Sequence, residues 1–229
     1  MSKLQKYLNE YVSVGMDSLS IEEMFELIDK NCKGYMKQLG ETRSPLFRAA
    51  KYTGIMGKSA VRKDRKRKVG DIWYGESAYK FLNEWLESSG LARRDRSIIC
   101  TPSKKQSKIF LDKGKRSIYY IFPTDPFKWS YCKNKDFNFD DNIHVILRSI
   151  DYATSQDIVD DFRKNNESMP HNELMKIVQK KVTKIMVEAA DFLERYIKKD
   201  NFEKPYSNRW EIWYECRSFY YIDSGEYTL

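Results

Sequence analysis

Three segments that lie far apart in the chain each carry a polar side chain in or beside a predicted strand. Arg48 ends the short apolar strand of SPLFRAAKY, and Thr101 and Ser103 follow the strand RSIIC. Glu211 opens the aromatic stretch RWEIWYECRSFYYI, where an unpaired buried carboxylate would be costly. Arginine suits a diphosphate, a strand-borne hydroxyl can shape a cleft, and an acid at the start of a later strand can supply negative charge. These residue types predict a nucleotide site.

The order of these residues resembles the Arg, Ser/Thr, Glu triad of the mono-ADP-ribosyltransferase fold, which binds NAD+ in a cleft between two small sheets. LFRAAKYTGI is similar to the first strand of that family, and EIWYECRSFYYID is similar to its closing Glu, strand, turn and strand. The intervening segments resemble uncharacterised tailed-phage proteins of the same type. The likeness covers residues 42–125 and 205–224.

The resemblance implies that Glu211 and Thr101 are catalytic. In this reaction the bond from ribose to nicotinamide breaks and leaves an oxocarbenium-like sugar, whose positive charge a carboxylate stabilises. Glu211 would supply that carboxylate, and Thr101 or Ser103 would shape the cleft and orient Glu211 by a hydrogen bond. The sequence departs from the best-known toxins at Arg209, where they have a second acid that helps to activate the acceptor.

The resemblance also implies which residues bind NAD+. Arg48 would hold the diphosphate, and Ser103 would shape the cleft. Tyr119 would stack on the nicotinamide, and Tyr120 and Trp129 are alternatives for that role. NAD+ is thus expected as a substrate, with no metal.

Two functions of different classes remain open. The first is an NAD-dependent ADP-ribosyltransferase, similar to phage proteins, that modifies a host protein or nucleic acid. The second is a catalytically inactive binding module on the same scaffold, which binds nucleic acid or a host or virion protein. The triad order favours the first, whereas Arg209 and the basic charge favour the second.

The chain has 229 residues and a formal net charge of +8, which favours an anionic partner. The segment RKDRKRK at 62–68 contributes +5 of this charge and is either a solvated loop or a clamp for a polyanion. Its candidate anion-binding residues are Arg62, Lys63, Arg65, Lys66, Arg67 and Lys68. Arg93, Arg94 and Arg96 either contact a nucleic-acid backbone or pair with acids.

Other site classes are excluded. GIMGKS resembles the end of a phosphate-binding loop, but Tyr52 occupies the place of the first glycine. Four dispersed cysteines and two histidines, His144 and His171, do not have the spacing of a zinc site, and both histidines are predicted to be structural. Because no long apolar run and no signal-peptide pattern is present, we expect a cytoplasmic protein with reduced thiols and no membrane partner.

The elements that must position these residues follow from hydrophobic periodicity. Helices are predicted at 20–40, which begins with the capping box of Ser20 and Glu23, at 75–90 and at 172–199. Strands are predicted at 96–101, 116–123, 143–150 and 209–222, and a short apolar strand in SPLFRAAKY is predicted to end at Arg48. We therefore expect an α+β fold in one domain over 1–229, and the resemblance implies that it is an ADP-ribosyltransferase-like split β-sandwich with a cleft between two small sheets. An N-terminal helical region (1–40) precedes the core (41–229), which includes a helical segment at about 151–200.

Overall fold

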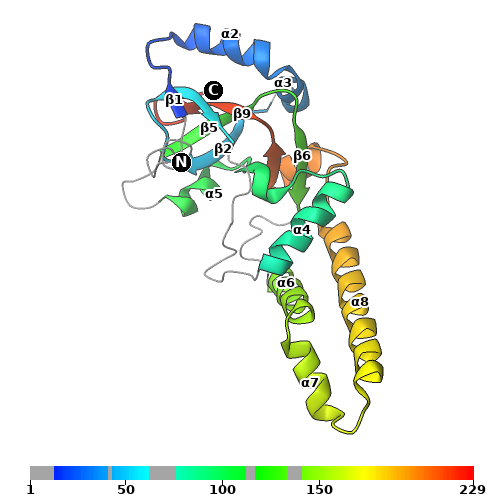
Figure 1. Cartoon of the computed structure of the whole chain (residues 1–229). Coiled ribbons are helices and arrows are strands. Elements are labelled where there is room, and N and C mark those ends of the chain that lie inside the picture. Colours follow the sequence, from blue (N-terminus) through cyan, green and yellow to red (C-terminus); the bar gives the residue numbers. More distant parts are fainter. Residues whose placement is uncertain (1–12, 41–42, 62–75, 112–116, 134–140) are drawn as a thin grey trace.

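In the computed structural model the chain forms two antiparallel sheets with helices packed against them (Figure 1). The structure describes residues 13–40, 43–61, 76–111, 117–133 and 141–229. The predicted α+β class is confirmed. None of the described helices has the length and apolarity needed to cross a membrane.

The first sheet has five strands. Their order is β1 (Ser13–Gly15), β3 (Met56–Ala60), β9 (Ser218–Asp223), β5 (Ser117–Pro123) and β2 (Leu46–Ala50). The predicted strand at 116–123 and the second half of 209–222 are therefore confirmed. The short strand predicted to end at Arg48 is present as β2 but continues to Ala50, and β1 and β3 were not predicted. GIMGKS contributes most of β3, so it is part of a strand, consistent with rejecting a phosphate-binding loop. Gly57 is needed there, because a Cβ would lie 2.3 Å from the carbonyl oxygen of Val14 and 2.5 Å from the Tyr221 hydroxyl.

The second sheet has four strands. Their order is β4 (Ser97–Cys100), β8 (Ile212–Glu215), β6 (Lys128–Cys132) and β7 (Ile197–Lys198), and a 3-10 turn η1 (Arg94–Arg96) leads into β4. Side chains alternate between its two faces, as the period of a strand requires. Ile212 and Tyr214 belong to the core shared with the five-stranded sheet, whereas Trp213 belongs to a second core under the helices.

The N-terminal helical region is two helices, α2 (Ile21–Asn31) and α3 (Lys33–Leu39), so the single helix predicted at 20–40 is wrong. The helical path is interrupted at Cys32, whose φ is −124° and whose Sγ donates to the carbonyl oxygen of Phe122 at 3.5 Å. The tertiary contact of this buried thiol accompanies the break, and the apolar pattern does not record it. The capping box is confirmed: Ser20 accepts from Glu23 N at 3.2 Å, and Glu23 accepts from Ser20 N at 2.7 Å.

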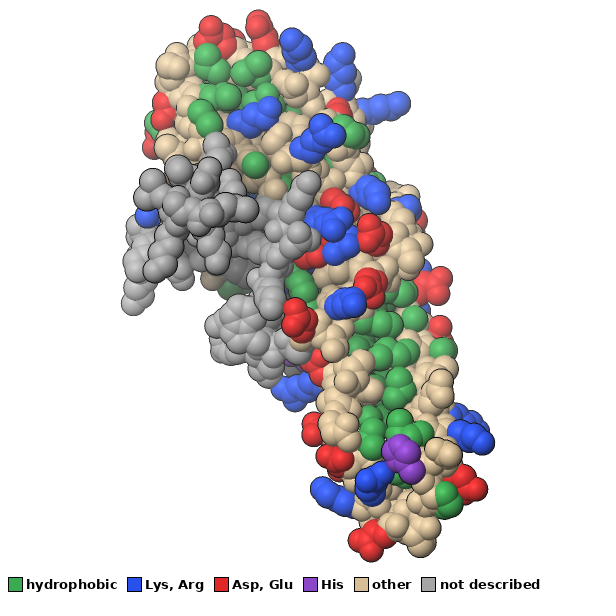
Figure 2. Space-filling model, in the orientation of Figure 1, with side chains coloured by type: hydrophobic (Ala, Val, Ile, Leu, Met, Phe, Trp, Pro, Cys, Tyr) green, Lys and Arg blue, Asp and Glu red, His purple; other side chains and the backbone are tan. Residues whose placement is uncertain are grey.

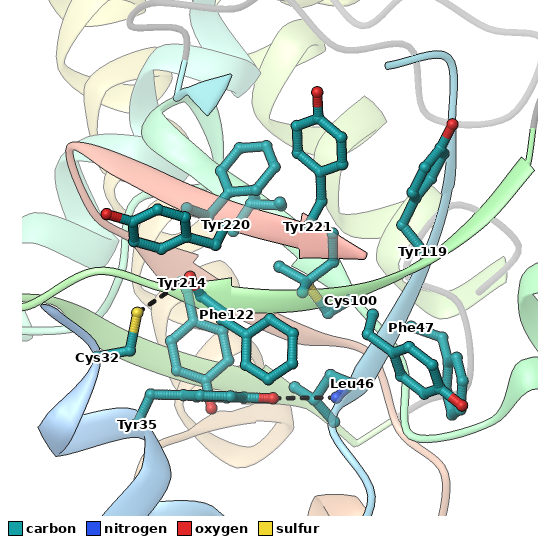
Figure 3. Packing of buried hydrophobic residues seen from close by; sticks show 14 of the residues in the cluster. Cys32, Tyr35, Leu46, Phe47, Cys100, Tyr119, Phe122, Tyr214, Tyr220 and Tyr221 are labelled. Carbon is teal, nitrogen blue, oxygen red and sulfur yellow. Dashed lines mark hydrogen bonds between the residues drawn. The ribbon is translucent and has the colours of Figure 1, made fainter. Parts of the chain in front are cut away.

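The core between the sheets is rich in aromatic rings (Figure 3). The Tyr35 ring makes T-shaped contacts with Phe122 at 6.1 Å and with Tyr214 at 5.6 Å, so one side chain of α3 touches both sheets. The Tyr35 hydroxyl accepts from the backbone N–H of Leu46 at 3.0 Å. Burial raises the pKa of Tyr35 and that of Tyr214 well above 10.

Helices cover the other face of the four-stranded sheet. They are α4 (Glu76–Ser88), α6 (Asp141–Thr154) and α8 (His171–Tyr196), with α7 (Asp157–Asn165) between the last two. Short elements complete the fold: α5 (Lys104–Ser107), η2 (Lys108–Phe110) and α9 (Glu203–Ser207). The predicted helices at 75–90 and 172–199 are confirmed, and Gly90 after α4 has the positive φ of +66° expected of a helix stop.

The strand predicted at 143–150 is wrong, because this segment lies within α6. Ile143, Leu147 and Ile150 are at most 1% exposed and share one helical face, whereas Val145 is 62% exposed. A short run of β-branched residues fits a strand or a helix equally well by periodicity alone. Packing against α4 and α8 selects the helix.

Candidate functional site

The three predicted segments meet where the two sheets join, at a place here called the sheet junction: β2, the end of β4 and the start of β8. Phe47 and Thr101 exchange both backbone hydrogen bonds, at 2.8 and 3.0 Å, which links β2 to the residue after β4. Thr101 and Glu211 each lie one residue beyond Cys100–Ile212, the last pair between β4 and β8. Because neighbouring strands are about 4.8 Å apart, the backbones of Arg48, Thr101 and Glu211 lie within roughly 10 Å.

Arg48 lies on β2 opposite Tyr119 and is partly buried. Its Nη1 donates to the carbonyl oxygen of Ile99 on β4 at 2.7 Å. This bond fastens one sheet to the edge of the other. A guanidinium has five N–H donors, and the bond to Ile99 uses one of its nitrogens. Arg48 can therefore hold the junction and still present donors to an anion.

Thr101 and Ser103 form the turn that follows β4. The Thr101 Oγ1 donates to Oε1 of Gln106 at 2.9 Å and accepts from the N–H of Ser103 at 3.2 Å. The Ser103 hydroxyl in turn accepts from the Gln106 N–H at 3.2 Å and caps α5. Both hydroxyls thus have local structural roles. Thr101, which lies opposite Glu211 where the pairing of β4 with β8 ends, is buried with 6% of its surface exposed.

Glu211 is 4% exposed and lies in a buried ion pair. Its Oε1 accepts from the indole Nε1 of Trp213 at 2.5 Å and lies 3.8 Å from Nη2 of Arg94. Arg94 is 1% exposed, and its guanidinium carbon lies 5.7 Å from the centre of the Trp213 ring. An acid between aromatic strand residues is therefore accommodated by a cation and an indole donor.

Arg94 was not predicted as the partner of Glu211. For the arginines of RRDR at 93–96, two roles were predicted: contact with a nucleic-acid backbone or pairing with acids. In the structure Arg93 and Arg94 pair with acids. Arg93 binds Asp95 at 2.6 Å and Glu87 at 2.7 Å, and these carboxylates raise its pKa above the usual range. The acids near these arginines in the sequence indicated that ion pairs could form. The sequence did not indicate that Arg94 pairs with Glu211, because no spacing rule connects two positions so far apart.

Tyr119 is buried within the five-stranded sheet rather than displayed at the junction. Its ring lies 4.9 Å from that of Tyr52 and 5.4 Å from that of Tyr221, and burial raises its pKa. The two alternatives for the stacking role also pack internally. The Tyr120 ring contacts Phe47 at 5.1 Å, and Trp129 is half-buried and stacks on Tyr131.

The remaining predicted residues are away from the junction or outside the described chain. The six basic residues Arg62, Lys63, Arg65, Lys66, Arg67 and Lys68 lie outside the described residues. His144 lies on α6, and His171 begins α8, where its Nδ1 is 2.9 Å from Nη2 of Arg163. Over the described ranges, no group of three or more His, Cys, Asp or Glu residues could hold a metal ion.

Comparison of the chain with protein-family models, with curated proteins and with solved structures finds no match.

Proposed function

We propose that the protein is an NAD-binding protein of the mono-ADP-ribosyltransferase type, with its nucleotide site at the sheet junction. The observation that carries the proposal is the backbone pairing: Phe47–Thr101 and Cys100–Ile212 bring Arg48, Thr101 and Glu211 together at the meeting point of two antiparallel sheets. The three side chains have the types and the chain order that this chemistry requires. The split β-sandwich and its cleft are part of the same proposal.

Each residue has a role set by the bond that breaks. The N-glycosidic bond of NAD+ is cleaved, nicotinamide leaves with the bonding electron pair, and the oxocarbenium-like ribose is attacked by an acceptor nucleophile that loses its proton. Arg48 binds the diphosphate through its remaining donors. Glu211 offsets the positive charge of the ribose, and Thr101 keeps the adjacent backbone in place. Ser103 shapes the rim of the site, and Tyr119, which is paired with Arg48 across β5 and β2, supports the strand that carries this arginine.

Arg48→Lys is the sharpest test of nucleotide binding, because it keeps the charge and removes the planar fork. The affinity for NAD+, measured by calorimetry, should fall about tenfold or more, which corresponds to about 1.4 kcal/mol. Arg43→Lys is the matched control, since Arg43 is also partly buried but pairs with Glu203 and stacks on Tyr206 away from the junction. Absence of NAD+ binding by the wild type at millimolar concentration would contradict the proposal.

Catalysis is tested by release of nicotinamide and by transfer of labelled ADP-ribose to proteins and nucleic acids of a host extract. Glu211→Gln should abolish both activities, whereas Glu215→Gln on the same strand should retain them. Glu211→Gln also leaves Arg94 without its counter-ion, so the urea midpoint of each variant must be measured alongside. An active Glu211→Gln variant would remove Glu211 from the mechanism.

The second candidate is an inactive binding module on the same scaffold, and a specific observation favours it. The charge of Glu211 is compensated inside the fold by Arg94 at 3.8 Å and by Trp213, so less of its field is available to a bound ribose. Arg209, two residues earlier, supplies no second acid. This candidate predicts NAD-independent, salt-sensitive association with DNA or RNA that weakens when the six cations of 62–68 are neutralised. Unchanged affinity in that variant would separate the basic segment from function.

A further inference from the structure

A helical hairpin projects from the sheets and has little core of its own. This hairpin, here called the arm, consists of α7 and the opposite half of α8, residues 157–184 (Figure 1). Its hydrophobic cluster has three buried residues, Ile158, Leu174 and Val178, and the partly buried residues that pack against them are Tyr152, Val159, Phe162, Met169, Val182 and Ile185. At about 1.5–3 kcal/mol for each buried aliphatic side chain, this core stabilises the arm weakly.

Apolar side chains remain partly uncovered along the arm and its base. Figure 2 shows hydrophobic side chains gathered in a strip that runs along the helices of the arm. On α8, Met175 and Ile177 are each 39% exposed and Val187 is 54% exposed. The helices α7 and α8 pack on each other and, at the base of the arm, on α6. Each helix buries one stripe, and the flanks of that stripe remain exposed. Met175 and Ile177 lie on opposite flanks of the buried stripe of α8, because residues two positions apart on a helix are separated by about 200°.

The two helices of the arm differ in the sign of their net charge. The start of α7 carries Asp157, Asp160 and Asp161, all exposed, and its last turn carries Arg163 and Lys164, so that the net charge of α7 is −1. The first half of α8 carries Lys176, Lys180, Lys181 and Lys184, all exposed, against one acid, Glu173. Within the described chain, the first three of these lysines form no ion pair, and Lys184 pairs with Glu188 of its own helix at 3.7 Å.

We propose that the arm is a self-association surface on which a second copy of the chain docks, with α7 of each copy packed beside α8 of the other. This arrangement has twofold symmetry, so every contact is made twice. It places the aspartates of one α7 next to the lysines of the facing α8, and it covers the apolar strip by completing a four-helix bundle. Charge complementarity within one chain selects a second copy as the occupant.

The dimensions of the arm set the size of such an interface. The part of α8 in the arm, residues 171–184, extends for about 21 Å, and the nine residues of α7 extend for about 14 Å, at 1.5 Å per residue. With a helix width of about 10 Å, the two flanks supply roughly half of the about 800 Å² that a standard interface buries on each partner. The expected dimer is therefore a weak one.

Sedimentation velocity of the full chain over a concentration series tests the proposal. The wild type should dimerise, and raising the salt concentration should weaken the dimer because the exposed charges are screened. Lys176→Glu with Lys180→Glu should raise the dissociation constant about tenfold or more, through repulsion of the facing aspartates. Asp157→Lys with Asp160→Lys should do the same.

The decisive experiment is a charge swap that combines all four substitutions in one chain. The basic residues are then on α7 and the acidic residues on α8, so opposite charges face each other again and the dimer should be restored. A damaged fold would not produce this recovery. Lys33→Glu with Lys37→Glu on α3 is the matched control for net charge and should leave the dimer unchanged. A wild type that stays monomeric at all concentrations would overturn the proposal. A dimer whose dissociation constant is unchanged by the arm substitutions would also overturn it.

Discussion

The body of the fold, meaning the two sheets and the helices packed against them outside the arm, buries its side chains differently from the arm. The body has two hydrophobic cores: Tyr35 contacts both sheets in one, and Trp213 of the other lies beside the buried pair of Glu211 and Arg94. The arm buries Ile158, Leu174 and Val178 with partly buried neighbours, and its charged side chains are exposed. A buried ion pair is thus part of the body, whereas the charges of the arm lie at its surface.

The largest effect is expected for Arg94→Met. The substitution leaves the carboxylate of Glu211 buried without its cation, which costs about 3–5 kcal/mol of unfolding free energy. Lys180→Met in the arm should change stability by less than about 0.5 kcal/mol, because that side chain is exposed. Urea denaturation followed by far-UV circular dichroism measures both. The double variant Arg94→Met with Glu211→Leu should recover much of the loss, and equal stability of the two single variants would contradict the buried pair.

A smaller difference is expected between two leucines of equal burial, Leu82 in the body at 0% exposure and Leu174 in the arm at 1%. Leu82→Ala should cost about 3–5 kcal/mol, because the surrounding packed core cannot collapse into the cavity. Leu174→Ala should cost about 2 kcal/mol, since the thin arm can close around the gap. Hydrogen exchange should show opening over the whole molecule in the first variant and only over the arm in the second. Equal and global effects would mean that the arm is part of the body's cooperative unit.

Alkaline pH should weaken the body selectively. Burial raises the pKa of Tyr221 from 10 to about 12, and it raises those of Tyr35 and Tyr214 as well. Between these values the unfolded chain has lost a proton that the native state keeps, so stability is complete below pH 10 and falls as the pH rises. For Tyr221 the loss is on the order of 2 kcal/mol. Urea midpoints at rising pH, with tyrosinate absorbance, measure it.

The arm segment 157–184 contains no tyrosine, so it provides the internal control. The alkaline decrease should be smaller in Tyr221→Phe when each protein is compared with its own stability at neutral pH. A stability that stays constant between pH 8 and pH 12 would show that the buried phenols do not control alkaline unfolding.

Much of the fold could be predicted because its long helices carry their own signals. The stripe of α8, the capping box of α2 and the glycine after α4 are local features, and each is present where it was expected. Two predictions, the strand at 143–150 and the single helix at 20–40, are wrong because tertiary contacts decide the structure there. The apolar run at 143–150 fits a strand and a helix alike, and Cys32 interrupts a helical pattern where its thiol meets Phe122, 90 residues away.

The candidate site shows the same division. The sequence by itself determined the residue types and their order, Arg48, Thr101 and Glu211, because short-range strand patterns place each beside a strand. Only the tertiary structure decided what surrounds them. The pairing register brings the three segments together, and the fold supplies Arg94 and Trp213 to Glu211. Pairing between strands far apart in sequence, and the partner of a buried charge, depend on packing across the whole chain, which no local pattern encodes.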